Sequence, residues 1–378
     1  MLLAAIIVFA VLMIGLSMWN SLANRQGGIP QIKSPILPEP ENKSIEDAPL
    51  AASVAKKLDI PWALDFLPDG SIVFTERAGR IRLIDIRMGL LPDPLLSIDE
   101  VVHIGEGGLL GIAVHPDFVK NPFIYVYYTY QNGTDLTNKV MRFRMQDRNL
   151  LDEKLIIDSI PGASIHNGGR IKFGPDDLLY ITTGDATISN YAQDKNSLVG
   201  KILRLKDDGT IPGNNPFPGS PVFSFGHRNP QGLAWDDRGR LWATEHGSQA
   251  NDELNLIEPG KNYGWPNIRG DEKAQGLVSP IIHSGTDTWA PSGIAYFEGS
   301  LFFAGLRSQS LFEVIVDDEP TLRRHLNRNF GRLRDAVVGP DYYLYILTSN
   351  RDGRGVPSED DDDQMVKINP KKLNESVQ

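Results

Sequence analysis

A histidine enclosed by glycines is the first residue of this sequence that could do chemistry. His166 lies in the segment IHNGGR, directly before the stretch IKF at 171–173, which predicts a strand. An imidazole can accept a proton near neutral pH, because its reference pKa is about 6.5. Glycines let the backbone approach a ligand closely. The same pattern is also typical of a histidine that makes only structural hydrogen bonds in a turn, so both interpretations stay open.

Arginines form the second group of candidate residues. Arg228 begins the segment RNPQ, and Arg332 and Arg334 lie two residues apart in the segment GRLRD. On an extended segment, residues two apart point to the same side. Guanidinium groups bind carboxylates in a bidentate manner, so these arginines could hold an anionic ligand. An arginine in a surface loop is more often a solvated charge, and the residues alone do not exclude that alternative.

Two segments carry oxygen ligands that could bind a hard cation such as calcium. The segment EHGS, which starts at Glu245, ends a predicted strand with a sharp turn that exposes backbone carbonyls, and Asp252 and Glu253 follow it. The acidic run from Glu359 to Asp363 precedes a predicted edge strand. Neither segment has the EF-hand pattern. Without further information, both are equally typical of solvated, charged loops.

Several catalytic patterns are absent from the sequence. No G-x-G-x-x-G follows a predicted strand, because the segment that begins Gly105-Glu106-Gly107 continues to Gly111 instead. This argues against a nicotinamide cofactor. The HExxH, GxSxG and P-loop patterns do not occur either. With no cysteine, disulfides, thiolate zinc sites and thiol nucleophiles are excluded.

A turn followed by a short strand recurs six times and must position these residues. The strands of the six copies lie at 71–76, 123–128, 178–183, 240–245, 300–304 and 344–348. Each interval leaves room for about three further strands of five or six residues. Units of this size cannot bury both faces alone and stack radially around a channel. We therefore predict an all-β fold, a six-bladed β-propeller whose functional groups gather on loops at one mouth of the channel; a β-sandwich is the alternative.

The first fifty residues differ in composition from the rest. Leu2 to Met18 are apolar apart from a glycine and a serine, and a run of about 17 to 20 such residues can just span a bilayer. We predict a hydrophobic N-terminal helix within 1–24, a Pro-rich linker at 25–50 and the propeller at 51–372. No basic residue precedes the apolar run, which favours a retained membrane anchor and an extracytoplasmic propeller. Secretion after signal cleavage is the alternative.

The charge of the chain restricts its partners. The 38 basic and 48 acidic residues give a formal net charge of −10. Nucleic-acid phosphates need a basic face, so a nucleic-acid partner is not expected. A neutral or polar small molecule fits the composition better.

Five stretches of the chain resemble the glucose/sorbosone dehydrogenase family, soluble sugar dehydrogenases that use pyrroloquinoline quinone (PQQ). These stretches are Asp59–Asp85, Gly105–Tyr128, Ser164–Arg204, Gly226–Pro266 and Phe330–Pro370. The resemblance implies a six-bladed propeller, in agreement with the repeat. It also implies PQQ- and calcium-dependent oxidation of an aldose at its anomeric carbon, with an unidentified electron acceptor. A calcium-dependent propeller lactonase or related hydrolase, and a non-catalytic binding module, are the alternatives.

The resemblance also implies roles for individual residues. His166 matches the catalytic base, and Arg228 matches an arginine that holds the cofactor and stabilises a developing oxyanion. Arg307 stands where relatives often have a cofactor-binding lysine, and Glu106 replaces a glutamine found in some of them. The remaining matches to cofactor-binding positions are Asn229, Gln231, Arg332 and Arg334. The carbonyls of Gly247 and Ser248 match ligands of the cofactor's calcium, and Glu253 and Tyr263 match a second, structural calcium site.

Overall fold

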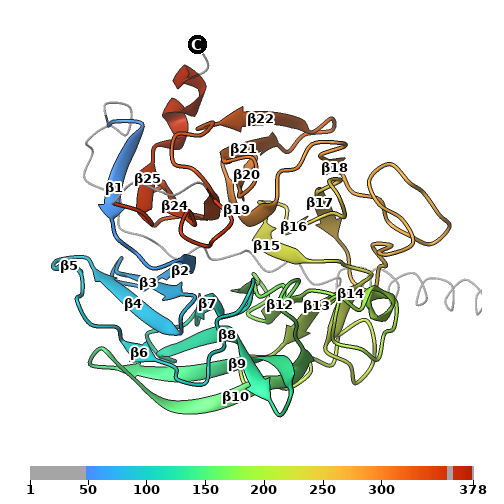
Figure 1. The fold of residues 1–378 in the computed structure, drawn as a ribbon, viewed down its shortest axis with the longest axis horizontal. Helices are drawn as coiled ribbons and strands as arrows, with labels where there is room; N and C mark the ends of the chain where they lie inside the picture. Colours follow the sequence, from blue (N-terminus) through green and yellow to red (C-terminus); the bar gives the residue numbers. More distant parts are fainter. Residues whose placement is uncertain (1–47, 356–360, 377–378) are drawn as a thin grey trace, which may run out of the picture. The chain divides into compact units, whose positions relative to one another are not determined.

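The computed structural model describes residues 48–355 and 361–376, which form six antiparallel sheets (Figure 1). The first three sheets in chain order are the following: β2 (Pro61–Phe66), β3 (Ile72–Glu76), β4 (Arg80–Asp85) and β5 (Gly89–Leu90), with β6 (Leu96–Ser97) also paired to β4; β7 (Leu109–Val114), β8 (Phe123–Asn132), β9 (Asp135–Gln146) and β10 (Asn149–Pro161); β11 (Ile171–Phe173), β12 (Leu179–Thr183), β13 (Lys201–Leu205) and β14 (Val222–Phe225).

The other three sheets complete the ring, and the last one joins the two ends of the described chain. They are β15 (Pro230–Trp235), β16 (Leu241–Glu245), β17 (Glu253–Ile257) and β18 (Ile282–His283); β19 (Pro291–Phe297), β20 (Ser300–Gly305), β21 (Ser310–Ile315) and β22 (Thr321–His325); and β23 (Leu333–Val338), β24 (Leu344–Thr348), β25 (Met365–Ile368) and β1 (Ala51–Ala55). Because β1 pairs with β25, the first strand closes the sheet of the last three. The predicted six-bladed β-propeller is confirmed.

The six turn-and-strand copies of the sequence coincide with one strand of each blade. They are β3, β8, β12, β16, β20 and β24, each the second strand counted from the centre of the propeller (Figure 1). The second strands are almost entirely buried, as β12 and β16 illustrate. A strand that is covered by neighbouring blades on both faces needs apolar and β-branched residues throughout, and this is the repeated signal.

The strand order determines which loops can meet at the mouth. Each first strand runs antiparallel to its second strand, so that Pro230 pairs with Glu245 and Leu333 pairs with Thr348. The loop that enters a first strand and the loop that leaves a second strand therefore lie at the same end of the propeller. Twelve loop ends, two from each blade, converge there.

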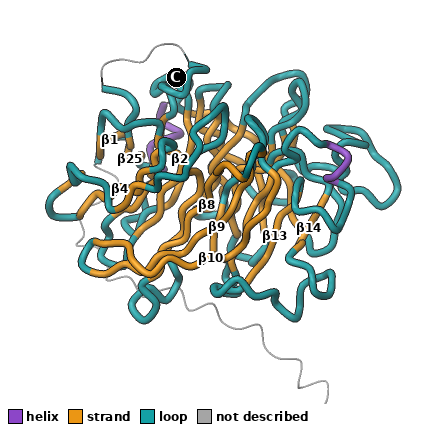
Figure 2. The backbone as a smooth tube through the Cα atoms, turned by 60° about the horizontal axis from the view of Figure 1, so that its bottom comes forward, coloured by secondary structure: helices purple, strands orange, loops and turns teal. Residues whose placement is uncertain are grey.

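Neighbouring blades approach closely at their first strands. A Cβ atom on Gly232 of β15 would lie 2.3 Å from the carbonyl oxygen of Ser292 in β19. Real Cβ atoms do not approach an oxygen so closely, so only glycine fits at this contact. Strands make up most of the regular structure in Figure 2, and the described helical segments are two short 3₁₀ turns, Ser189–Ala192 and Pro370–Ser376.

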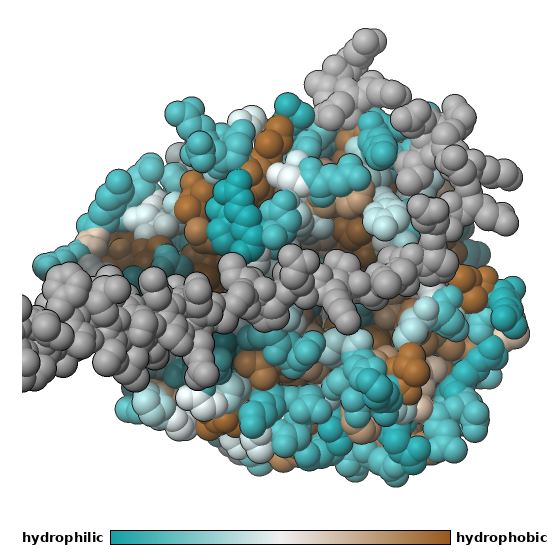
Figure 3. All heavy atoms as spheres, turned by 180° about the vertical axis from the view of Figure 1, so that it is seen from behind, coloured by the Kyte–Doolittle hydropathy of each residue, from teal (hydrophilic) through white to brown (hydrophobic). Residues whose placement is uncertain are grey.

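The predicted anchor at 1–24 lies outside the described residues, as does all of the predicted linker except 48–50. Within the described residues, no helix is both long enough and apolar enough to span a membrane. On the face of the propeller shown in Figure 3, hydrophobic residues lie in separate areas between hydrophilic ones.

Candidate active site

His166 lies in the loop that enters β11, with its ring held from both sides. Its Nδ1 lies 2.8 Å from Oδ1 of Asp185, and its Nε2 lies 3.0 Å from Nη2 of Arg228. Because a guanidinium can only donate, Nε2 is the accepting nitrogen and Nδ1 carries the proton that Asp185 accepts. This tautomer leaves the Nε2 lone pair on the side of Arg228, where a substrate hydroxyl would have to approach.

Asp185 comes from the loop that leaves β12 and is the orienting acid that the sequence analysis did not identify. Its side chain is only 2% exposed. Oδ1 also accepts the backbone N–H of Thr187, and Oδ2 accepts Nε1–H of Trp265 at 2.8 Å. Burial alone would raise the pKa of Asp185, but the hydrogen bonds from His166, Thr187 and Trp265 lower it. A carboxylate held in this way keeps its negative charge beside the imidazole.

Arg228 connects the loop before β15 to the histidine. Its Nη1 donates to the carbonyl of His246 at 3.2 Å, and its guanidinium lies over the ring of Trp265. Burial lowers the pKa of Arg228, although nearby carboxylates, Asp185 first among them, oppose the change. The next residue, Asn229, is buried and accepts the backbone N–H of Gly168 through Oδ1, so it fixes the loop that carries His166.

A cavity of about 470 Å³ lies next to the loop of this histidine, and half of its lining residues are charged; His166 itself is not one of them. Its lining residues are Trp62, Arg77, Gly105, Glu106, Gln231, His246, Thr288, Ala290, Leu306, Arg307, Arg332, Arg334, Asp352 and Arg354. Among these, five arginines face two carboxylates, which leaves an excess of three positive charges. Glu106 and His246 connect the cavity to His166 and Arg228, through the contacts of Glu106 with the His166 backbone and of Arg228 with His246.

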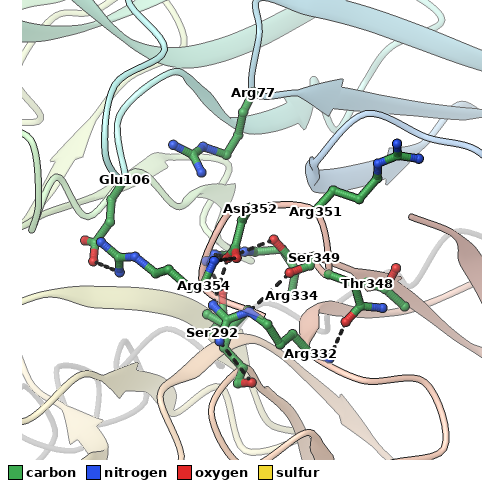
Figure 4. Close-up of polar contacts among 12 residues, drawn as sticks. Arg77, Glu106, Ser292, Arg332, Arg334, Thr348, Ser349, Arg351, Asp352 and Arg354 are labelled. Carbon is green, nitrogen blue, oxygen red and sulfur yellow. Dashed lines mark hydrogen bonds and ion pairs between the residues drawn. The ribbon is translucent and has the colours of Figure 1, made fainter. Parts of the chain in front are cut away.

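Arg332 and Arg334 point into the cavity from the start of β23, as their two-residue spacing predicts (Figure 4). Asp352 lies between them, 2.7 Å from Nη2 of Arg332 and 3.9 Å from Nη2 of Arg334. Burial would raise the pKa of Asp352, but Arg332 and Arg334 lower it. Burial also lowers the pKa of Arg334 to about 9, which leaves this arginine protonated at neutral pH. Asp352 thus holds both guanidinium groups in place.

Three further predicted cofactor residues, Gln231, Arg307 and Glu106, line the same cavity, whereas Arg228 and Asn229 are not among its lining residues. Gln231 accepts Nη1–H of Arg334 through Oε1 at 2.9 Å. Arg307 is exposed, and its side chain makes no hydrogen bond or ion pair to the described residues that surround it. Glu106 forms an ion pair with Arg354. Although burial would raise the pKa of Glu106, the N–H of His166 together with the charges of His246 and Arg354 lowers it to about 2.

Several buried donors at this end of the propeller have no acceptor among the described residues. They are Nε of Arg77, Arg228 and Arg334, Nδ2 of Asn229 and Nε2 of His246. A buried donor without a partner costs about 1 to 3 kcal/mol, so such a cluster is typical of a site that a ligand completes. Four of the five are N–H groups that only donate, and the fifth is a histidine nitrogen that can donate. A ligand that completes these donors would therefore be rich in acceptor oxygens.

The predicted metal ligands lie in two different local environments. Gly247 and Ser248 begin the loop that leaves β16, in which Gln249, Ala250 and Asn251 all have positive φ values. Asp252 fixes this loop, because Oδ1 accepts the N–H of Gly247 and Oδ2 accepts the N–H groups of Trp289 and Ala290. The carboxylate of Asp252 is thus used inside the protein, and metal ligands here would have to be backbone carbonyls.

Glu253 and Tyr263 are not joined by a shared contact. Burial, and then the charge of Glu245, raise the pKa of Glu253 to about 8, and its oxygens accept from Asn255 and Gly270. The Tyr263 hydroxyl donates to the carbonyl of Leu256 and accepts the N–H of Glu258. Across the described parts of the chain, no group of three or more His, Cys, Asp or Glu side chains could hold a metal. The second calcium site stays a prediction.

Sequence reasoning missed four residues contributed by loops that leave second strands. Arg77, Asp185, Asp352 and Arg354 all belong to such loops. The aromatic side chain at the cavity is Trp62, over which the guanidinium of Arg334 lies at 5.7 Å from the ring centroid. Trp289, which stands between the lining residues Thr288 and Ala290, is buried against Phe303 and Phe312 in the core. The only signal in the sequence that could have identified Trp62 as a site residue is its position directly after a turn and before an apolar run.

Known proteins resemble this chain over most of the propeller. Residues 58–356 match the family described as Glucose / Sorbosone dehydrogenase. The chain is 40% identical to the PQQ-bound aldose sugar dehydrogenase of Streptomyces coelicolor, with a TM-score of 0.79, over 84% of this chain and 96% of that one. It is 32% identical to the aldose sugar dehydrogenase YliI of Escherichia coli (strain K12), over 83% of this chain and 91% of that protein. It is also 38% identical to quinoprotein glucose dehydrogenase B of Acinetobacter calcoaceticus, over 60% of this chain and 54% of that protein.

The fold, the site and these similarities define an oxidoreductase of the sugar dehydrogenase class. The family match covers well over half of the chain. The chain belongs to the glucose/sorbosone dehydrogenase family.

Proposed function

We propose that this protein oxidises an aldose at its anomeric carbon with PQQ, and that the aldose becomes a lactone. The observation that carries the proposal is the cavity beside His166, in which five arginines outnumber two carboxylates. PQQ has three carboxylates and an ortho-quinone. The excess of three positive charges and the unpartnered donors of the site match these acceptors in charge and in kind.

The residues that would hold the cofactor come from three blades. Arg332 and Arg334 would bind carboxylates, and Arg307 offers a further cation that is free of internal partners among the described residues. Arg228, Asn229 and Gln231 would contribute further contacts, and Glu106, the remaining residue predicted from the sequence, forms an ion pair with Arg354. Bound PQQ supplies a quinone that accepts the hydride from the sugar.

The proton moves to the histidine. Nε2 of His166 accepts the proton of the anomeric hydroxyl. At the same time a hydride leaves the anomeric carbon for the quinone, and a double bond forms between that carbon and its oxygen. The carboxylate of Asp185, 2.8 Å from Nδ1, stabilises the imidazolium that results. Arg228 donates to Nε2 in the absence of substrate and would donate to the developing oxyanion during the reaction.

Calcium is the part of the proposal that rests most on resemblance. Calcium prefers hard oxygen ligands, which the carbonyls of Gly247 and Ser248 would provide in the loop that Asp252 fixes. Glu253 and Tyr263 would belong to the second, structural site. An extracytoplasmic location with a membrane anchor within 1–24 also remains part of the proposal, as does an unidentified electron acceptor.

Reconstitution of the purified protein tests the function. Dye-linked oxidation is measured across a panel of aldoses, with and without PQQ and with calcium or a chelator. We expect activity only with PQQ, accompanied by the absorption band of a bound quinone. Hydrolysis of lactones without PQQ would instead support a propeller lactonase. The absence of both activity and quinone binding would support a binding module.

Replacement of the base provides the second test. In His166→Gln the turnover number should fall by about two to four decades, the usual contribution of a general base. PQQ affinity should stay within about threefold of the wild type, because the arginines are unchanged. Unaltered turnover in the folded variant would remove His166 from the mechanism.

A further inference from the structure

Glu106 is an acidic residue at the edge of a cavity suited to an anion, and this position calls for an explanation. The two loops that meet here are pressed together, because a Cβ atom on Gly105 would lie 2.0 Å from the carbonyl oxygen of Ser164. Glu106 makes two hydrogen bonds across this contact. Its N–H donates to the Ser164 carbonyl at 2.7 Å, and its Oε2 accepts the N–H of His166 at 2.9 Å.

The second of these bonds matters because of the backbone conformation of the base. His166 has a φ of 60°, in the left-handed region. A residue with a Cβ atom pays about 1 to 2 kcal/mol to adopt this conformation, so surrounding contacts must stabilise it. The Glu106 carboxylate is the acceptor for the His166 N–H in this conformation. It is therefore a direct restraint on the residue that carries the imidazole.

Glu106 is itself fixed by two arginines from other segments, one at its carboxylate and one at the backbone on either side of it. Arg354, in the loop between β24 and β25, donates to Oε1 (Figure 4). Arg77, after β3, donates to the carbonyls of Gly105 and Gly107 and so holds the backbone on both sides of Glu106. Both arginines line the cavity. The negative charge of Glu106 is thus neutralised by Arg354 and is not left free to repel an anionic cofactor.

We propose that Glu106 is a positioning residue for the base. Its carboxylate holds the His166 backbone in the left-handed conformation, and Arg354 on a distant blade holds the carboxylate. The pair joins three blades across the mouth and fixes the backbone from which the His166 imidazole projects toward Asp185 and Arg228. The effect of Glu106 on turnover rests on the proposed function, whereas its effect on the His166 backbone does not.

Hydrogen–deuterium exchange of the protein without ligands tests the conformational part. In Glu106→Ala the peptide that contains the His166 amide should exchange about tenfold faster or more, because its acceptor is lost. Glu106→Gln keeps an acceptor oxygen and should stay within about threefold of the wild type. Asp117→Ala, which breaks the exposed ion pair with Lys120, is the matched control and should leave this peptide unchanged. Equal exchange in Glu106→Ala and the wild type would overturn the proposal.

Kinetics and cofactor binding test the catalytic part. The turnover number of Glu106→Ala should fall by about 10- to 100-fold, since a small displacement of a catalytic group has effects of this size. Its KM and PQQ affinity should change by less than about threefold, and Glu106→Gln should restore most of the turnover. Loss of PQQ binding in Glu106→Ala, or a Gln variant as impaired as the Ala variant, would contradict positioning.

Arg354→Met keeps the proposal testable if Glu106→Ala does not fold. It should raise exchange at His166 by about threefold or more, because the carboxylate loses its cation. Unchanged exchange would overturn the role of Arg354. Failure of the wild type to bind PQQ would contradict the proposed function, yet the exchange results would still decide the conformational role of Glu106.

Discussion

At the residue scale, the site combines a proton acceptor with a fixed direction. The tautomer of His166 follows from its two partners, since Arg228 can only donate and Asp185 can only accept while ionised. Asp185 also accepts hydrogen bonds from Thr187 and Trp265. The base is therefore oriented before any ligand arrives, which reduces the reorganisation that the reaction requires.

Replacement of the orienting acid should separate catalysis from binding. In Asp185→Asn no orientation of the amide can accept from His166, Thr187 and Trp265 at once, and the charge that stabilises the imidazolium is lost. We expect turnover to fall by about one to three decades with PQQ affinity within about threefold. Asp271→Asn, which alters the exposed pair with His283, serves as the control. Wild-type turnover in Asp185→Asn would contradict the role assigned to Asp185.

The charge of Glu106 predicts an acid-dependent stability. Its pKa is about 2 in the folded protein and 4.5 as the reference value, so the folded state binds fewer protons between these two pH values. The combined contribution of the His166 N–H, the charge of His246 and the Arg354 ion pair is therefore complete above pH 4.5 and is lost as the pH falls toward 2. It amounts to at most about 3 kcal/mol, before solvent screening.

Chemical denaturation at pH 5 and at pH 3 measures this contribution. The free energy of unfolding of Glu106→Gln should decrease less over this interval than that of the wild type, because a glutamine does not titrate. Parallel losses of stability in the two proteins would show that the Glu106 carboxylate is not stabilised by its partners.

At the element scale, buried polar contacts hold the loops that enter the site. Lys201, the first residue of β13, is completely buried, and its Nζ donates to the carbonyls of Tyr191, Ala192 and Val199. These three residues belong to the connection at 184–200 between β12 and β13, which also carries Asp185. The ammonium of Lys201 thus shapes the loop that carries the orienting acid.

Removal of this ammonium should destabilise the fold. In Lys201→Met three carbonyls lose their donor, and we expect the free energy of unfolding to fall by about 2 to 4 kcal/mol. Lys195, exposed in the same loop, provides the control, since Lys195→Met should change it by less than about 1 kcal/mol. Equal stability of Lys201→Met and the wild type, measured by urea denaturation, would mean that the three carbonyls find other donors.

The sequence predicts the second strands well and part of the site poorly. The second strands are recognisable because each is buried by its neighbours and follows a turn, and both signals are local. Part of the site has local signals too, because glycine-containing segments mark the positions of His166, Arg228 and Arg332. The contact between Glu106 and Arg354 joins positions 248 apart, and such pairs arise only once the ring is closed. For this reason Arg77, Asp352 and Arg354 were not predicted.

At the scale of the whole molecule, the charge of the mouth opposes that of the chain. The formal net charge is −10, yet the cavity has five arginines against two carboxylates. An anionic ligand is therefore repelled by the protein as a whole and attracted at one place. Electrostatic complementarity of this kind favours specificity, and salt weakens it.

The salt dependence of cofactor binding should reflect this arrangement. We expect the dissociation constant of PQQ to rise by about tenfold between low and moderate ionic strength, because the contacts are between charges. Arg307→Met should show a smaller rise, since one exposed cation of the cavity is missing. A dissociation constant that does not depend on salt would argue against carboxylate recognition.

The most direct test of the central claim is an equilibrium titration of the purified protein with PQQ, followed by the absorption of the bound quinone. The wild type should bind PQQ with a stoichiometry of one, and Arg334→Met should bind at least about tenfold more weakly, because a buried guanidinium at the cavity is lost. Arg144→Met, on the exposed pair with Asp152, should bind like the wild type. No binding by the wild type, or equal binding by Arg334→Met, would contradict a PQQ site in this cavity.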